Sequence, residues 1–129
     1  MNEYRILVVD DEEDLCEILK FNLENEGYEV DTANSAEDAL KMDISTYDLL
    51  LLDVMMGEIS GFKMASMLKK EKKTAKIPII FITAKDTEND TVTGFNIGAD
   101  DYISKPFSLR EVAARVKAVL RRTRHTETE

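Results

Sequence analysis

Residues 49–53 read LLLLD, four leucines followed at once by a carboxylate. An unbroken apolar run of this length indicates a strand buried on both faces, which is typical of parallel sheets. Residues 5–9, RILVV, form a similar run, and Asp10 and Asp11 come directly after it. Both segments therefore predict buried strands that end in acidic side chains.

The rest of the chain alternates between short apolar runs and helical spacing. Further strands are expected at residues 28–33, 79–82 and 102–103. The predicted helices carry their apolar residues within 15–23, 36–42, 62–68, 87–97 and 109–120. Strands that alternate with helices, and that are too apolar to be half exposed, predict an α/β fold. We expect a doubly wound five-stranded parallel sheet with helices on both faces.

Three local signals mark helix ends. Ser35 with Asp38, and Ser108 with Glu111, have the spacing of capping boxes at helix starts. Gly27 follows the first predicted helix, where glycine commonly ends helices. The fourth predicted helix is the weakest, because it has few apolar residues and an internal glycine.

Composition narrows the class of protein. The chain has 129 residues, which suits a single domain. Its single cysteine, Cys16, rules out an internal disulfide and favours a reducing compartment. A formal net charge of −9 argues against binding nucleic acid or an anionic membrane unaided. The absence of a long apolar run or a secretory signal completes the prediction of a cytoplasmic protein without a membrane partner.

Polar side chains follow four of the predicted strands. Asp10 and Asp11 follow the first, Asp53 the third, Thr83 the fourth, and Lys105 the fifth. In an open parallel sheet, ligands bind at the carboxyl ends of the strands. We therefore expect three carboxylates, a hydroxyl and an ammonium group at one edge of the sheet.

Each of these residues alone has an ordinary structural explanation, since an aspartate after a strand usually forms a turn. Together they are harder to explain in that way, because clustered carboxylates repel one another and require a cation. Carboxylate oxygens with room for water suit Mg²⁺. A hydroxyl and an ammonium group could then hold a phosphoryl group, with Asp53 as the nucleophile that attacks phosphorus.

Four segments carry a family resemblance when taken in order. They are ILVVDDE at 6–12, LLLDVMM at 50–56, Thr83-Ala84, and KPF at 105–107. Over about residues 3–122 the sequence resembles the response-regulator receiver domains of two-component signalling. Residues 98–111 and 120–122 are similar to the OmpR/PhoB subfamily in particular.

The resemblance implies a flavodoxin-like (βα)5 fold with strand order 2-1-3-4-5. It implies a receiver domain over residues 1–122. Residues 123–129 would then be a linker or a disordered tail before a DNA-binding output domain, and DNA would be bound only through that domain. A stand-alone receiver that acts by docking to other proteins is the alternative.

The resemblance also implies roles for individual residues. Asp53 would accept a phosphoryl group from a sensor histidine kinase, in a Mg-dependent reaction of a switch rather than of a turnover enzyme. The implied Mg²⁺ ligands are Asp11, Asp53 and the backbone carbonyl of Met55, with Asp10 acting through water. Thr83 and Tyr102 would form the switch pair. Lys105 would bind the phosphate, and its bond to Pro106 would be cis.

Phosphorylation would then change the face made by the fourth helix, fifth strand and fifth helix, and would favour a homodimer. The implied dimer face consists of Asp100, Asp101, Arg115 and Arg122. This sequence departs from the family at two positions. Gly57 stands where proline is usual, which predicts a more flexible loop. Thr91 stands where the subfamily has a basic partner for Glu111, which predicts weaker dimers.

Other chemistries fit less well. A flavodoxin-like redox carrier would need a hydroxyl- and glycine-rich loop after the first strand, where this chain has the acidic residues 10–14. A phosphatase with an aspartate nucleophile would need Asp-x-Asp at that place. The sequence has neither GxxxxGK[ST] nor GxGxxG after a strand, which argues against nucleotide binding.

Overall fold

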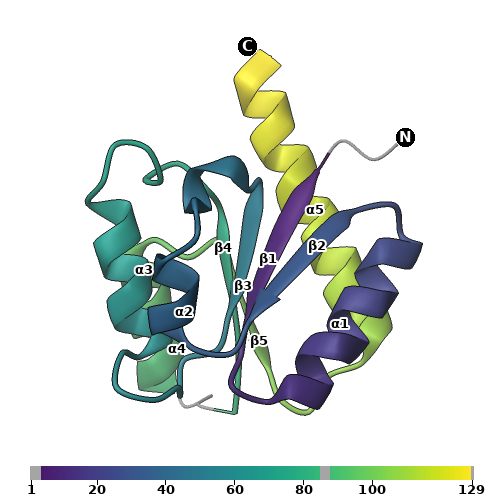
Figure 1. Ribbon diagram of the computed structural model, residues 1–129. Coiled ribbons are helices and arrows are strands. Elements are labelled where there is room, and N and C mark those ends of the chain that lie inside the picture. The colour runs from purple at the N-terminus through teal and green to yellow at the C-terminus, as the bar shows by residue number, and fades with distance from the viewer. Residues whose placement is uncertain (1–3, 85–87, 129) are drawn as a thin grey trace.

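A computed structural model describes residues 4–84 and 88–128, with side chains described up to residue 123. It contains a five-stranded parallel sheet in the order β2-β1-β3-β4-β5, as predicted (Figure 1). The strands, in chain order, are β1 (Arg5–Val9), β2 (Glu29–Ala33), β3 (Leu49–Leu52), β4 (Ile79–Thr83) and β5 (Asp101–Ser104).

Helices cover both faces of the sheet (Figure 1). They are α1 (Glu13–Asn25), α2 (Ala36–Leu40), the short 3₁₀ helix η1 (Ile44–Thr46), α3 (Gly61–Lys69), α4 (Glu88–Ile97) and α5 (Leu109–Thr128). The helices α1 and α5 pack on one face, and α2, α3 and α4 lie on the other. The doubly wound fold is therefore confirmed.

The strands contribute side chains to two separate hydrophobic cores, one on each face, because successive side chains of a strand point to opposite faces of the sheet. In β1, Ile6 and Val8 join the core under α1 and α5, whereas Leu7 and Val9 join the core under α2 and α3. All four leucines of β3 are buried, two in each core. The unbroken apolar runs in the sequence are thus explained by a sheet covered on both sides.

The predicted helix ends are confirmed. The hydroxyl of Ser35 accepts a hydrogen bond from the backbone N–H of Asp38, and Ser108 does the same for Glu111, each at 3.0 Å. Gly27 follows α1 with a φ of 102°, a backbone conformation that favours glycine. Ser60 caps α3 in the same way, through the N–H of Lys63, and this cap was not predicted.

One helix end and one short helix differ from expectation. The helix α5 continues to Thr128, although a linker or disordered tail was expected from residue 123. Once a helix exists, each added residue brings a backbone hydrogen bond without a new nucleus, so a polar end can extend it. The short helix η1 was not predicted. The helix α4 is described from Glu88, and its expected first residue, Thr87, lies outside the described residues.

The sheet topology fixes where a site can form. The connection after β1 leads to β2 on one side of it, and the connection after β3 leads to β4 on the other side, so the strand order reverses between β1 and β3. Ligands of such folds bind in the crevice at this reversal. Asp10 and Asp53 directly follow β1 and β3 there. Within the described residues, no helix is long and apolar enough to cross a membrane.

Candidate functional site

Asp10 is a buried carboxylate at the end of β1, with only 2% of its surface exposed. Its Oδ1 accepts a hydrogen bond from the backbone N–H of Glu12 at 2.9 Å, and its Oδ2 accepts one from the Lys105 ammonium at 3.0 Å. Burial raises the pKa of Asp10 to about 6, although both hydrogen bonds oppose the rise. The ionised form of Asp10 is therefore costly without a nearby cation.

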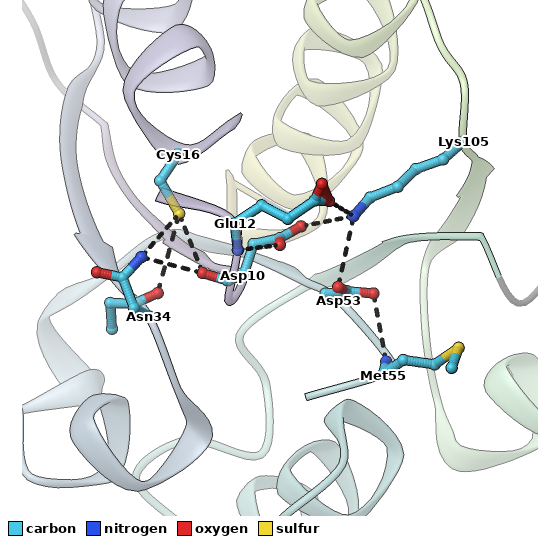
Figure 2. Close-up of polar contacts among 8 residues, drawn as sticks. Asp10, Glu12, Cys16, Asn34, Asp53, Met55 and Lys105 are labelled. Atoms are coloured by element: carbon cyan, nitrogen blue, oxygen red, sulfur yellow. Dashed lines mark hydrogen bonds and ion pairs between the residues drawn. The ribbon is translucent and has the colours of Figure 1, made fainter. Parts of the chain in front are cut away.

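Asp53 is buried beside Asp10, with 5% of its surface exposed. Its backbone N–H donates to the carbonyl of Val9 at 2.9 Å, which ties the end of β3 to the end of β1. Its Oδ1 accepts from the backbone N–H of Met55 at 3.3 Å, and its Oδ2 lies 3.4 Å from the Lys105 Nζ (Figure 2). The acceptor predicted from the sequence thus lies at the centre of the site.

Asp11 completes a group of three carboxylates that could hold a metal ion. One oxygen from each of Asp10, Asp11 and Asp53 lies within 4.8 Å of the other two. Asp11 is exposed while the other two are buried, so one side of the group is open to water. Hard oxygen ligands with room for water suit Mg²⁺. The residues present therefore fit the predicted magnesium site.

Lys105 brings the positive charge. Its backbone N–H donates to the carbonyl of Thr83 at 2.9 Å, which fixes the end of β5 against β4. Burial acts to lower the pKa of Lys105, but contacts with Glu12 and Asp10 and the charge of Asp53 outweigh burial and raise it above its usual value. The ammonium is therefore charged at neutral pH. The peptide bond between Lys105 and Pro106 is cis, as expected.

Glu12 is a contact of Lys105 that was not predicted. Its Oε1 lies 2.8 Å from the Lys105 Nζ, closer than the carboxylate of either aspartate (Figure 2). The only sequence signal was its place directly after the aspartate pair. Residues 93 positions apart make this contact, so no local pattern could reveal it.

A second set of contacts supports the turn after β1. The side-chain amide of Asn34 donates to the carbonyl of Asp10 at 3.1 Å, and the thiol of Cys16 donates to the same oxygen at 3.3 Å (Figure 2). Burial raises the pKa of Cys16 to about 11, so the thiol keeps its proton. These contacts join the β1–α1 turn to the β2–α2 turn and fix the backbone that carries Asp10.

The predicted switch residues lie on neighbouring strands. Thr83 is fully buried at the end of β4. Tyr102 is half-buried on β5, and its ring centroid lies 6.0 Å from that of Phe81. A Cβ on Gly94 of α4 would lie 3.1 Å from the Tyr102 ring, so this helix packs closely on the tyrosine.

The predicted dimer-face residues lie on β5, α5 and the turn before β5. Arg115 forms an ion pair with Asp101 at 3.0 Å and with Glu111 at 3.2 Å. The carboxylate of Asp100 accepts from the backbone N–H of Ile79, and Arg122 donates to the backbone carbonyl of Asp100 at 3.4 Å. These contacts are all within one chain.

Residues 6–117 match the family described as response regulator receiver domain. Over 120 residues the chain is 50% identical to the alkaline phosphatase synthesis transcriptional regulatory protein PhoP of Bacillus subtilis, covering 92% of this chain and 49% of PhoP. It is 46% identical over 125 residues to the transcriptional regulatory protein SrrA of Staphylococcus aureus, covering 96% of this chain and 51% of SrrA. The chain thus spans about half the length of these relatives.

Solved structures agree with the fold and the family. A CheY-like response regulator receiver domain protein from Methanospirillum hungatei superimposes with a TM-score of 0.88 at 30% identity, covering 95% of this chain and 98% of that one. The BeF3-activated receiver domain of DrrB gives a TM-score of 0.84 at 31% identity, covering 94% and 99%. DrrB is described as a Thermotoga maritima OmpR/PhoB homolog. The chain therefore belongs to the response regulator receiver domain family of two-component systems, as its OmpR/PhoB-like sequence predicted.

Proposed function

We propose that this chain is a phospho-accepting receiver in which Asp53 takes a phosphoryl group from a sensor histidine kinase in a Mg-dependent reaction. The observation that carries the proposal is the placement of Asp53, which is a buried member of the carboxylate cluster that fits Mg²⁺ and lies 3.4 Å from the Lys105 Nζ. A carboxylate in such a setting is positioned to attack phosphorus as a nucleophile. In this proposal the protein acts in the cytoplasm.

In the reaction, one Asp53 oxygen forms a bond to phosphorus while the bond from phosphorus to the donor group breaks. The donor group leaves with the electron pair, and Asp53 becomes an aspartyl phosphate. Asp11, Asp53 and the Met55 carbonyl would hold Mg²⁺, with Asp10 acting through water, and the ion supplies charge neutralisation when bound. Lys105 orients the phosphoryl oxygens through its ammonium, and the Thr83 hydroxyl donates a further hydrogen bond.

The phosphoryl group then acts on the switch pair. Thr83 moves toward the new oxygens, Tyr102 packs inward, and the face of α4, β5 and α5 changes. Two charge-assisted hydrogen bonds contribute at most about 3–6 kcal/mol, and the net gain is smaller because Lys105 already contacts the unmodified Asp53. A shift from about 1:99 to 99:1 needs about 5.5 kcal/mol. The isolated domain therefore switches incompletely, and binding of Mg²⁺ and formation of a homodimer complete the change.

Two exposed apolar side chains support α4 as part of an interaction surface. Val92 and Phe95 are 50% and 47% exposed on this helix. A homodimer formed there would bury them and would bring the region of Asp101 and Arg115 to the interface. In a longer chain such a dimer would control a DNA-binding output domain, as expected from relatives that are named transcriptional regulators.

Incubation with acetyl phosphate tests the proposal. With Mg²⁺ present, intact-mass measurement should show the gain of one phosphoryl group, and a chelator should prevent the gain, because the clustered carboxylates otherwise repel the donor. Equal gain with and without the metal, or no gain at all, would contradict the proposed reaction.

Gly94→Ala tests the switch. The added methyl group would lie 3.1–3.2 Å from the rings of Tyr102 and Phe81, so a neighbour must yield. Phe81 is fully buried and Tyr102 is half-buried, so Tyr102 is displaced outward. A crowding cost of about 1 kcal/mol opposes the inward position of Tyr102, so the dimer that forms with BeF3⁻ should be about fivefold weaker. Analytical ultracentrifugation measures this change. The helix propensity of alanine offsets the crowding, so the free energy of unfolding changes little.

Asn25→Ala is the matched control for Gly94→Ala. Asn25 is exposed at the end of α1, away from the face of α4, β5 and α5, and alanine raises helix propensity there too. This control should dimerise like the unmodified chain. If both variants dimerise normally, the inward position of Tyr102 does not govern the switch.

A further inference from the structure

The Lys105 ammonium is shared by three carboxylates among the residues that the structure describes. Its Nζ lies 2.8 Å from Glu12, 3.0 Å from Asp10 and 3.4 Å from Asp53. An ammonium group has three N–H donors, so three acceptors account for its whole hydrogen-bonding capacity. A phosphoryl oxygen on Asp53 gains one of these donors only if a present partner gives it up.

Glu12 differs from the two other partners. Its side chain is 59% exposed, whereas those of Asp10 and Asp53 are 3% and 5% exposed. It lies outside the three-carboxylate group that fits a metal ion. If Glu12 releases Lys105, water can solvate the freed carboxylate, whereas release by Asp10, which stays a buried carboxylate after Asp53 is phosphorylated, would leave a desolvated charge. Of the two partners that remain carboxylates, Glu12 therefore releases Lys105 at the lower cost.

The local backbone does not account for a glutamate at this position. Glu12 is the N-cap residue of α1, where serine, threonine, aspartate and asparagine are preferred. Within the described part of the chain, its side chain makes no capping hydrogen bond. Instead it reaches across the site from α1 to the lysine that follows β5 (Figure 2).

We propose that Glu12 is a positioning residue that holds Lys105 at the rim of the site and competes with phosphoryl oxygens for its N–H groups. The inference rests on the proposed phosphoryl acceptance by Asp53. The backbone of Lys105 is fixed by its hydrogen bond to Thr83, so only the side chain moves between Glu12 and the phosphoryl group. Glu12 thereby sets the affinity of the site for phosphoryl groups without contacting phosphorus.

Three variants separate the contact from the charge. Glu12→Gln removes the negative charge and weakens the contact. Glu12→Asp keeps the charge but shortens the side chain by one methylene group, so the contact with Lys105 is lost. Glu13→Gln removes the same charge from the next residue, which is exposed and is not among the described carboxylates that contact Lys105.

The probe is BeF3⁻, a phosphoryl mimic, titrated by calorimetry at fixed Mg²⁺ concentration. We expect Glu12→Gln and Glu12→Asp to bind BeF3⁻ about two- to fivefold more tightly than the unmodified chain, the range expected for an exposed ion pair. Glu13→Gln should bind like the unmodified chain. Thermal unfolding of each variant shows whether its fold is intact.

The outcomes distinguish the two proposals. If the unmodified chain does not bind BeF3⁻ with Mg²⁺, the proposed function fails. If it binds but Glu12→Asp has unchanged affinity, or if Glu13→Gln matches Glu12→Gln, only net charge matters and the role of Glu12 is overturned. Weaker binding by either Glu12 variant also overturns it, because Glu12 would then hold Lys105 in its productive position.

Discussion

Asp53→Asn is expected to abolish phosphorylation by acetyl phosphate, so that intact mass shows no added phosphoryl group with or without Mg²⁺. The amide of asparagine is a far weaker nucleophile than a carboxylate. It also removes one of the three charges that would hold the metal. Other carboxylates near Lys105 remain, so a complete loss would identify Asp53 as the acceptor rather than its neighbours.

The same variant should remain folded. Burial is the main cause that raises the pKa of Asp10, and the charge of Asp53 raises it further. Removal of that charge relieves repulsion between two buried carboxylates and loses only the longest of the three Lys105 contacts, at 3.4 Å, so the free energy of unfolding without metal should rise. Denaturant unfolding measures this change. Loss of phosphorylation together with higher stability cannot be attributed to misfolding.

Asp14→Asn is the matched control, because Asp14 is an exposed carboxylate in the first turn of α1. It should be phosphorylated at the normal rate. If Asp53→Asn still gains a phosphoryl group, another side chain is the acceptor and the proposed function is wrong.

The sequence predicts this site well because strands do most of the positioning. Asp10 and Asp53 each follow a strand with a long apolar run, Lys105 follows the short fifth strand, and parallel strands end at one edge of a sheet. Chain order therefore suffices to bring them together. The metal-ion cluster of three aspartates and the contact of Lys105 with Asp53 follow from the same logic.

Side-chain contacts between distant segments could not be predicted from the sequence in the same way. Lys105 approaches Glu12 and Asp10 more closely than Asp53, and Asn34 supports Asp10 from another turn. These contacts depend on rotamers and on the shapes of loops, neither of which leaves a periodic pattern. The continuation of α5 past residue 122 was also missed, because its polar end lacks the apolar spacing that marks a helix.

Gly61→Ala is expected to disrupt the site by displacing the backbone of Asp53. A Cβ at this position would lie 2.0 Å from the backbone carbonyl oxygen of Asp53 and 3.0 Å from the Cα of Val54. Both obstacles are backbone atoms, so the loop that carries the acceptor must move by about 1 Å. Misplacement of this size can slow a reaction about 10²-fold. We expect a loss of that order in the rate of phosphorylation by acetyl phosphate.

Stability should fall in the same variant. Overpacking typically costs about 1–3 kcal/mol, whereas alanine gains only about 0.5–1 kcal/mol over glycine in a helix. The clash outweighs the gain because the hydrogen bond from the Gly61 N–H to the Val54 carbonyl, at 2.9 Å, holds α3 against the acceptor loop. Denaturant unfolding should therefore show a net loss in the free energy of unfolding of about 1–2 kcal/mol.

Gly57→Ala is the control in the same loop. Its added Cβ would meet only the end of the Glu37 side chain, at 4.0 Å, so there is room for the methyl group. Phosphorylation and stability should stay close to those of the unmodified chain. If Gly61→Ala were equally harmless, α3 could move away without displacing Asp53. The acceptor would then be positioned mainly by the hydrogen bond from its own N–H to Val9, on the β1 side of the site.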